Sequence, residues 1–284
     1  MSKSIQVFAL IFGNGINLFL GFLLVPYLSR SQLLADYGTY GQVILVIGFV
    51  VSMLSFGMDK VLYADLADKN IDSAVATKSN ATIGAVFGVI GLFFLLVCNS
   101  WISSYLNNEL LSGLILILAF SIPFQLVFRS FTAALIYHGE TKKFVIISVY
   151  TNIIRLALIF YFVQINYSLE CIFASLVFVP LLQCILAYLY LPSFLKKGEL
   201  SKQVIREQIL TGIPLGLTVM ISSFFKLTDG FVVSKMLGVE EFAIFRNGAI
   251  YIPVIAGIYA AINTIVLPDI SRLYGASEYA QIAK

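Results

Sequence analysis

The segment FVIISVYTNIIRLALIFYFV, residues 144–163, decides the fold class of this chain. Its length and apolar character match the roughly 20 residues that a helix needs to cross the hydrocarbon of a bilayer. It nevertheless carries Arg155 near its centre, and it contains no acidic residue. An ionised side chain at that depth costs about 2.5–3.5 kcal/mol on insertion scales, so it persists where it faces protein, water or a ligand. The segment therefore predicts a transmembrane helix that borders a polar interior.

The composition of the whole chain agrees with this interpretation. Hydrophobic residues make up 60% of the sequence and charged residues 12%, whereas soluble domains average about 25% charged residues. The basic residues are scattered and form no basic run, which argues against nucleic-acid binding. The three cysteines have neither CxxC nor zinc-ligand spacing, so we expect no metal and no cofactor.

Eight apolar segments are each long enough to cross a bilayer as a helix. They are Ile5–Leu28, Tyr40–Leu62, Ala81–Ser103, Leu111–Tyr137, Phe144–Val163, Leu169–Tyr190, Ile209–Phe231 and Phe242–Leu267. The first is expected to be a retained span, because no small-residue cleavage site closes it as a signal peptide would require. We therefore predict an all-α, polytopic membrane protein with about eight transmembrane helices and longer connections at Tyr63–Asn80 and Leu191–Gln208.

The basic residues in the loops predict the orientation of these helices in the membrane. The side that holds both predicted termini carries twelve: Lys3, Lys60, Lys69, Lys78, Lys142, Lys143, Lys196, Lys197, Lys202, Arg206, Arg272 and Lys284. The other side carries only Arg30 and Lys235. Because basic loops stay in the cytoplasm, both termini are expected to be cytoplasmic.

Polar residues within six of the spans recur at the three- and four-residue spacing that places them on one helix face. The candidate cavity residues are Asn14, Asn17, Asp59, Gln125, Arg129, Asn152, Arg155, Lys226, Asp229 and Arg246. The third span instead has a close-packing face of Gly84, Gly88 and Gly91, and the sixth is almost wholly apolar. We expect the other six spans to surround a polar cavity, with the third and sixth supporting it from outside.

A structural explanation competes with this one. Polar side chains also join helices without any transport function. Four charged residues would be close enough to a helix end to snorkel, namely Arg129, Lys226, Asp229 and Arg246. Lys226 and Asp229 would also be able to pair with each other at a spacing of three residues. Arg155 is the hardest to explain in these terms, because it is central in its span.

Two segments of the chain share a local pattern. Ser29-Arg30, Asp36-Tyr37 and Tyr40 correspond to Ser234-Lys235, Glu241-Phe242 and Phe245, with an offset of 205 residues from residue 29 to residue 234. In each copy a span ends, a short outer loop follows, and an aromatic residue opens the next span. The first two spans thus correspond to the seventh and eighth, which predicts a parallel repeat of the kind found in transporters.

Three stretches carry a resemblance to a known family. They are PYLSRSQLLADYGTYGQ (residues 26–42), TDGFVVSKMLGVEEFAIF (residues 228–245) and VLPDISRLY (residues 266–274). In order and spacing the chain resembles the polysaccharide transporter branch of the multidrug/oligosaccharidyl-lipid/polysaccharide exporter superfamily. These are flippases of O-antigen and capsule type, in the bacterial plasma membrane.

The resemblance implies two six-helix lobes that move an undecaprenyl-diphosphate-linked oligosaccharide from the inner to the outer leaflet by alternating access. It implies a lobe over residues 1–190, a cytoplasmic linker over 191–208, the first two helices of a second lobe over 209–270, and a tail over 271–284. Arg155 and Arg129 are the best candidates to contact the diphosphate, because guanidinium groups suit phosphate oxygens. A coupling cation, and the polymerase and glycosyltransferases of the same pathway, are the further partners implied.

The chain departs from the family in its number of spans. Members usually have twelve to fourteen, so eight spans raise the expectation of a fragment, a product of a disrupted gene, or a partner of a second chain. A cation-coupled drug exporter on the same fold is the main alternative, with Asp59 and Asp229 as its acidic candidates. An enzyme is not expected, since the sequence offers no Walker motif, no DxD and a lone His138.

Overall fold

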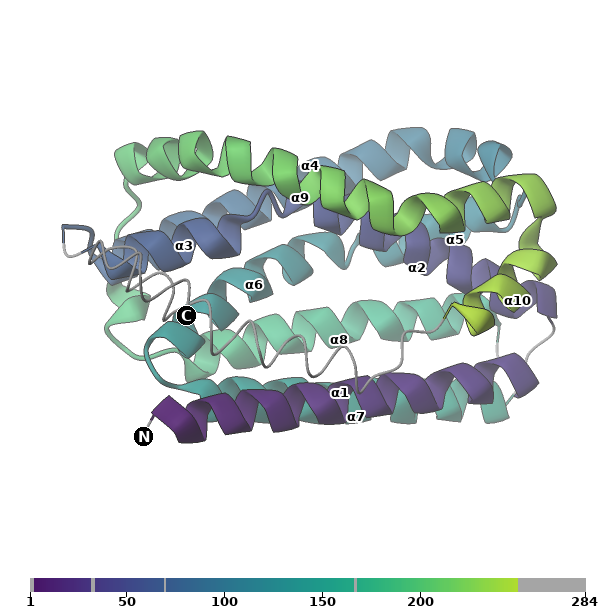
Figure 1. The fold of residues 1–284 in the computed structure, drawn as a ribbon, viewed down its shortest axis with the longest axis horizontal. Helices are drawn as coiled ribbons and strands as arrows, with labels where there is room; N and C mark the ends of the chain where they lie inside the picture. The colour runs from purple at the N-terminus through teal and green to yellow at the C-terminus, as the bar shows by residue number, and fades with distance from the viewer. Residues whose placement is uncertain (1–2, 32–33, 69, 166–167, 250–284) are drawn as a thin grey trace, which may run out of the picture.

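The computed structural model describes residues 3–31, 34–68, 70–165 and 168–249, and these residues form helices and connecting turns without a strand. The helices are α1 (Lys3–Ser31), α2 (Leu34–Leu54), α3 (Met58–Ala67), α4 (Ser73–Tyr105), α5 (Leu111–Ala119), α6 (Ile122–Tyr137), α7 (Thr141–Gln164), α8 (Leu169–Tyr190), α9 (Lys202–Leu237) and α10 (Val239–Gly248). The long helices run along the longest axis of the bundle (Figure 1). The predicted all-α class is confirmed.

Seven helical segments are long and apolar enough to cross a membrane. They are Phe8–Arg30, Leu34–Ala67, Ser73–Tyr105, Leu111–Tyr137, Thr141–Gln164, Leu169–Tyr190 and Lys202–Leu237. Each contains most of one predicted span, so the first seven are confirmed and the chain is a multi-pass membrane protein. The eighth, Phe242–Leu267, opens within α10, and the remainder lies outside the described residues.

The helices extend beyond the apolar segments into stretches predicted as loops. The connection expected over Tyr63–Asn80 is mostly helical, because α3 ends at Ala67 and α4 begins at Ser73. The Asp72 carboxylate caps α4 by accepting a 2.8 Å hydrogen bond from the Ala74 N–H. The connection expected over Leu191–Gln208 likewise ends early, at the start of α9. A helix ends where its last backbone groups find other partners, not where the membrane ends.

Two predicted spans are interrupted. The second breaks between α2 and α3, where Phe56 and Gly57 have φ values of 43° and 62° in the left-handed region. The fourth breaks between α5 and α6, and Pro123 lies in the first turn of α6. Proline is tolerated at that position because the first N–H groups of a helix have no intrahelical partner.

The glycine face of α4 packs closely on α6, as the sequence predicts. A Cβ added to Gly88 would overlap the Cα of Pro123, and one on Gly84 would lie 3.2 Å from the Leu126 carbonyl carbon. A Cβ on Gly91 would meet the Leu54 side chain. Only glycine allows this approach, since a side chain would overlap the backbone of α6.

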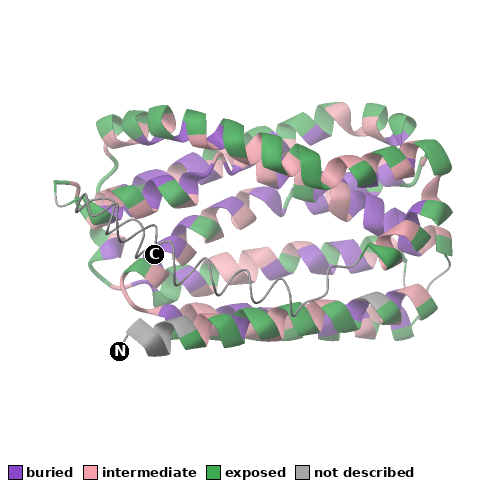
Figure 2. Ribbon diagram, in the orientation of Figure 1, coloured by how far each residue is buried: buried purple, intermediate pink, exposed green. Residues whose placement is uncertain are grey.

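The α2–α3 pair forms the centre of the bundle. In the most apolar stretch of this span 61% of the residues are buried, against 12% in the corresponding stretch of α1 and 22% in that of α9. Figure 2 shows the same division, with buried residues on the central helices and exposed ones along α1 and α9. The outer helices therefore have large faces that no described residue covers.

The last two helices of the described chain, α9 and α10, both pack against α2. The Gln42 amide of α2 donates a 2.7 Å hydrogen bond to the Ser234 hydroxyl of α9. The Tyr37 hydroxyl donates one of 2.8 Å to the Asn247 side chain of α10. The predicted repeat makes α2 and α10 equivalent, and the structure places these two helices side by side. The repeat and the lobe boundaries remain predictions.

Candidate functional site: a cationic cavity within the helix bundle

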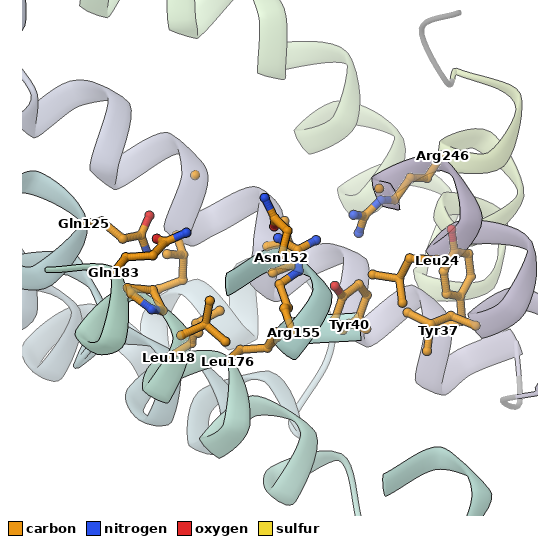
Figure 3. A pocket seen from close by; sticks show the side chains of 17 residues that line it. Leu24, Tyr37, Tyr40, Leu118, Gln125, Asn152, Arg155, Leu176, Gln183 and Arg246 are labelled. Carbon is orange, nitrogen blue, oxygen red and sulfur yellow. The ribbon is translucent and has the colours of Figure 1, made fainter. Parts of the chain in front are cut away.

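A cavity of about 340 Å³ lies within the bundle. Its walls come from α1, α2, α5, α6, α7, α8 and α10. The polar and aromatic residues of the lining are Tyr37, Tyr40, Gln125, Asn152, Arg155, Gln183 and Arg246. Figure 3 shows Gln125 and Gln183 together at one end of the cavity, Asn152 and Arg155 in the middle, and Arg246 at the other end.

Arg155 enters the cavity from the middle of α7. It follows Asn152 by three positions, so the helix turn places both side chains on the cavity face. Within the described part of the chain, Arg155 forms no hydrogen bond or ion pair. A guanidinium group at membrane depth is stabilised by an anionic or polar partner. The cavity is therefore equipped to receive one at this point.

Arg246 brings a second guanidinium group from α10. Its central carbon lies 5.5 Å from the centre of the Tyr40 ring, in a cation–π arrangement. Its Nη1 atom is buried, and it has no hydrogen-bond partner among the described residues. A Cβ added to Gly41 would lie 2.5 Å from that nitrogen. Gly41 thus leaves the space that lets Arg246 reach the cavity.

A chain of amide hydrogen bonds joins α1 to α7 beside the cavity. The Asn152 amide donates a 2.8 Å hydrogen bond to the Asn17 carbonyl oxygen. The Asn17 amide in turn donates one of 2.8 Å to the Ser148 hydroxyl. Asn17 therefore lies next to the cavity and orients Asn152, which lines it.

The lining of the cavity is cationic overall. Among the described residues, the lining contains two guanidinium groups and no carboxylate. Elsewhere, no three His, Cys, Asp or Glu side chains of the described chain gather to hold a metal ion. In a site of low dielectric constant, unpaired positive charges attract an anion strongly. The arrangement can bind an anionic group together with neutral hydrogen-bonding groups.

Several predicted residues lie elsewhere. Arg129 and Asp59 line a second, much smaller cavity beside Asn80, so Arg129 does not meet Arg155. Asn14, on α1, is exposed. Their proposed roles in binding remain predictions.

Lys226 and Asp229 are both exposed on α9, and no ion pair joins them in the described structure. Of the described residues of α9, none lines the large cavity. The expectation that the seventh span borders this cavity is therefore not met by its described residues. The charges of α9 lie on a face that the described helices leave uncovered.

The expectation for the sixth span is wrong. Its helix, α8, contributes Leu176, Val179, Pro180 and Gln183 to the cavity instead of supporting it from outside. Sequence reasoning also missed Tyr37 and Tyr40. Gln183 was detectable as a lone amide inside an apolar span. The aromatic residues were not, because tyrosine is common near membrane interfaces.

The fold and the cavity define a class, that of multi-pass α-helical membrane proteins with a partly polar cavity inside the helix bundle. A family model described as polysaccharide biosynthesis protein matches residues 28–282, which is most of the chain. The chain therefore belongs to this family, a flippase-type family of the exporter superfamily that the sequence resembles. Neither the curated proteins nor the solved structures compared with the chain gave a match.

Proposed function

We propose that this protein takes part in moving a lipid-linked, diphosphate-bearing glycan precursor across the bacterial plasma membrane. The observation that carries the proposal is the pair Arg155 and Arg246 in one cavity, to whose lining no described residue contributes a carboxylate. Membership of the polysaccharide biosynthesis family supports a glycan precursor as the cargo.

The chemistry of the two arginines favours a phosphate ligand. Guanidinium groups donate parallel hydrogen bonds that fit phosphate oxygens, and they remain charged at any physiological pH. Neither Arg155 nor Arg246 is neutralised by an acidic residue in the described chain. A diphosphate would supply the missing negative charge, and its departure would leave the cavity ready for the next molecule.

The proposal is tested by flipping of a fluorescent undecaprenyl-diphosphate oligosaccharide in liposomes that contain the full chain. Arg155→Gln is expected to slow flipping by about tenfold to a hundredfold, since hydrogen bonds to charged groups contribute about 1.5–3 kcal/mol. Arg155→Lys should fall between this variant and the unsubstituted protein, because it keeps the charge and loses the forked geometry.

Arg206→Gln is the matched control, since Arg206 is exposed at the start of α9 and lines neither cavity. It should flip the lipid at the unsubstituted rate. Equal rates for Arg155→Gln and Arg206→Gln would refute the proposed role of the cavity. Transport of a cationic dye that is lost on Asp229→Asn would instead support the drug-exporter alternative, which no contact in the described structure favours.

A further inference from the structure

Two glutamines at one end of the cavity have amide orientations that the surrounding hydrogen bonds determine. The Gln125 amide nitrogen of α6 donates a 2.8 Å hydrogen bond to the Ser121 hydroxyl oxygen. The Gln183 amide nitrogen of α8 donates one of 3.0 Å to the Thr151 hydroxyl oxygen of α7. Both glutamines line the cavity, whereas Ser121 and Thr151 are fully buried behind it.

The two hydroxyl groups can only accept these hydrogen bonds. The single Ser121 hydroxyl proton is donated to the Leu118 carbonyl at 2.6 Å. The Thr151 hydroxyl proton is donated to the Ile147 carbonyl at 2.7 Å. Because a hydroxyl group has one proton, each oxygen then needs a donor in front of it. Each glutamine must therefore turn its nitrogen toward the hydroxyl, and this leaves its carbonyl oxygen on the other side.

The carbonyl oxygens of Gln125 and Gln183 accept no hydrogen bond within the described chain. They are not among the polar atoms buried against protein, and both side chains border the cavity. Each amide also keeps one N–H that the hydroxyl does not use. This end of the cavity thus presents fixed acceptors, each with a donor beside it.

We propose that Gln125 and Gln183 form a subsite for the sugar attached directly to the diphosphate, an inference that rests on the proposed function. Neighbouring hydroxyl groups of a pyranose both donate and accept, and an acetamido group donates its N–H, so each would pair with an amide edge. Leu176, Val179 and Pro180 line the same cavity and offer an apolar surface to the C–H face of the ring.

The positions of the charged residues support a sugar at the glutamines and a diphosphate at the arginines. Arg155 lies one helical turn from Asn152, between the glutamines and Arg246 (Figure 3). A diphosphate held at the guanidinium groups would place its first sugar toward the glutamines. A metal cation is the other common partner of amide oxygens, but the described lining opposes it with two guanidinium groups and no carboxylate.

The test compares the full chain's affinity for two probes, undecaprenyl diphosphate and undecaprenyl diphosphate carrying one N-acetylhexosamine. The unsubstituted protein should bind the sugar-bearing probe more tightly. Gln183→Met, which keeps the length of the side chain and removes its polar atoms, should weaken binding of that probe by about tenfold. Its affinity for undecaprenyl diphosphate should be unchanged, which also shows that the variant is folded.

Thr151→Val is a second variant, outside the cavity. It keeps the branched shape of the side chain and removes the hydroxyl that orients Gln183, so it should also lower the affinity for the sugar-bearing probe alone. Gln164→Met is the matched control, because Gln164 is exposed at the end of α7 and does not line the cavity. It should bind both probes as the unsubstituted protein does.

The outcomes separate the two proposals. Equal affinity of the unsubstituted protein for both probes would overturn the sugar subsite and leave the diphosphate site standing. A Gln183→Met variant whose affinity for both probes falls equally would also overturn it. Binding of neither probe by the unsubstituted protein would refute the proposed function, and the subsite with it.

Discussion

The two cavity arginines differ in how the protein holds them. Arg246 is fixed by the Tyr40 ring and by the space that Gly41 leaves, so its charge is at a defined position before a ligand arrives. Arg155 has no such contacts in the described structure. A fixed donor contributes to binding without the cost of ordering it, whereas a free one can follow a ligand that moves. We therefore expect Arg246 to define the site and Arg155 to respond to its occupant.

His138, at the end of α6, is a residue whose ionisation should affect stability. Its ring meets the edges of Tyr137 and Phe194, each at 5.2 Å between ring centres. Its Nε2 atom is buried without a partner in the described chain. Burial lowers the pKa of His138 below its ordinary value of 6.5, because the charged form loses hydration.

The direction in which pH changes the stability follows from the linkage between protonation of His138 and folding. The unfolded chain binds a proton at His138 near pH 6.5, and the folded chain binds it only at lower pH. The stability due to neutral His138 is therefore complete above pH 6.5 and is lost as the pH falls below that value. Thermal unfolding in detergent between pH 7.5 and 5.5 should show a steeper decline for the unsubstituted protein than for His138→Phe. Parallel declines would exclude this role of His138.

At the scale of elements, the helices of this chain are joined by two kinds of contact. Small residues bring backbones together, as at Gly88 of α4 against Pro123 of α6. Amide side chains link helices by hydrogen bonds, as Gln42 does to Ser234 and Asn17 does to Ser148. Inside a membrane both are needed, because lipid is as apolar as the side chains and gives helices little reason to associate.

The Gly88 contact predicts a position-specific effect on stability. Gly88→Ala should destabilise the fold by about 1–3 kcal/mol, since the new Cβ would overlap backbone atoms of α6 that cannot move independently. Gly113→Ala in α5 is the matched control, because no atom of the described residues lies within 4 Å of its added Cβ. That change should be neutral or slightly stabilising.

Thermal unfolding of the two purified variants would measure the difference. An unfolding temperature for Gly88→Ala that equals or exceeds that of Gly113→Ala would show that α4 and α6 are not packed as described.

At the scale of the whole molecule, the bundle is asymmetric. The α2–α3 pair is the most buried of the seven described spans, while α1 and α9 have long faces that no described residue covers. The exposed Lys226 and Asp229 lie on α9, within a membrane-crossing segment. Charged side chains at such a depth are disfavoured against lipid. We therefore expect the charged face of α9 to meet protein or water rather than hydrocarbon.

The orientation of the whole molecule can be tested by labelling. With the native cysteines Cys98, Cys171 and Cys184 replaced by serine, Ser104→Cys and Lys142→Cys each place one exposed thiol at opposite ends of the bundle. An impermeant maleimide added to intact cells should label Ser104→Cys only, because the basic loops are expected in the cytoplasm. Labelling of Lys142→Cys alone would reverse the topology.

The sequence alone determined the class of this protein. Twenty-residue apolar segments have one stable form in a bilayer, since every backbone group must find its partner within the helix. The seven confirmed spans and the glycine face of α4 follow from this local physics, and so does the idea that Arg155 requires a polar surrounding. Span boundaries were less accurate, because the helices continue beyond the apolar segments as far as their caps.

Only the tertiary structure decided which of the polar residues meet. Arg155, Asn152, Gln125 and Arg246 share one cavity, whereas Arg129 and Asp59 lie at another, and α8 rather than α9 supplies a wall. Spacing within a helix fixes a face, but the rotation of each helix about its axis depends on packing with its neighbours. That packing depends on contacts between distant residues, such as Gly88 with Pro123, which no local pattern encodes.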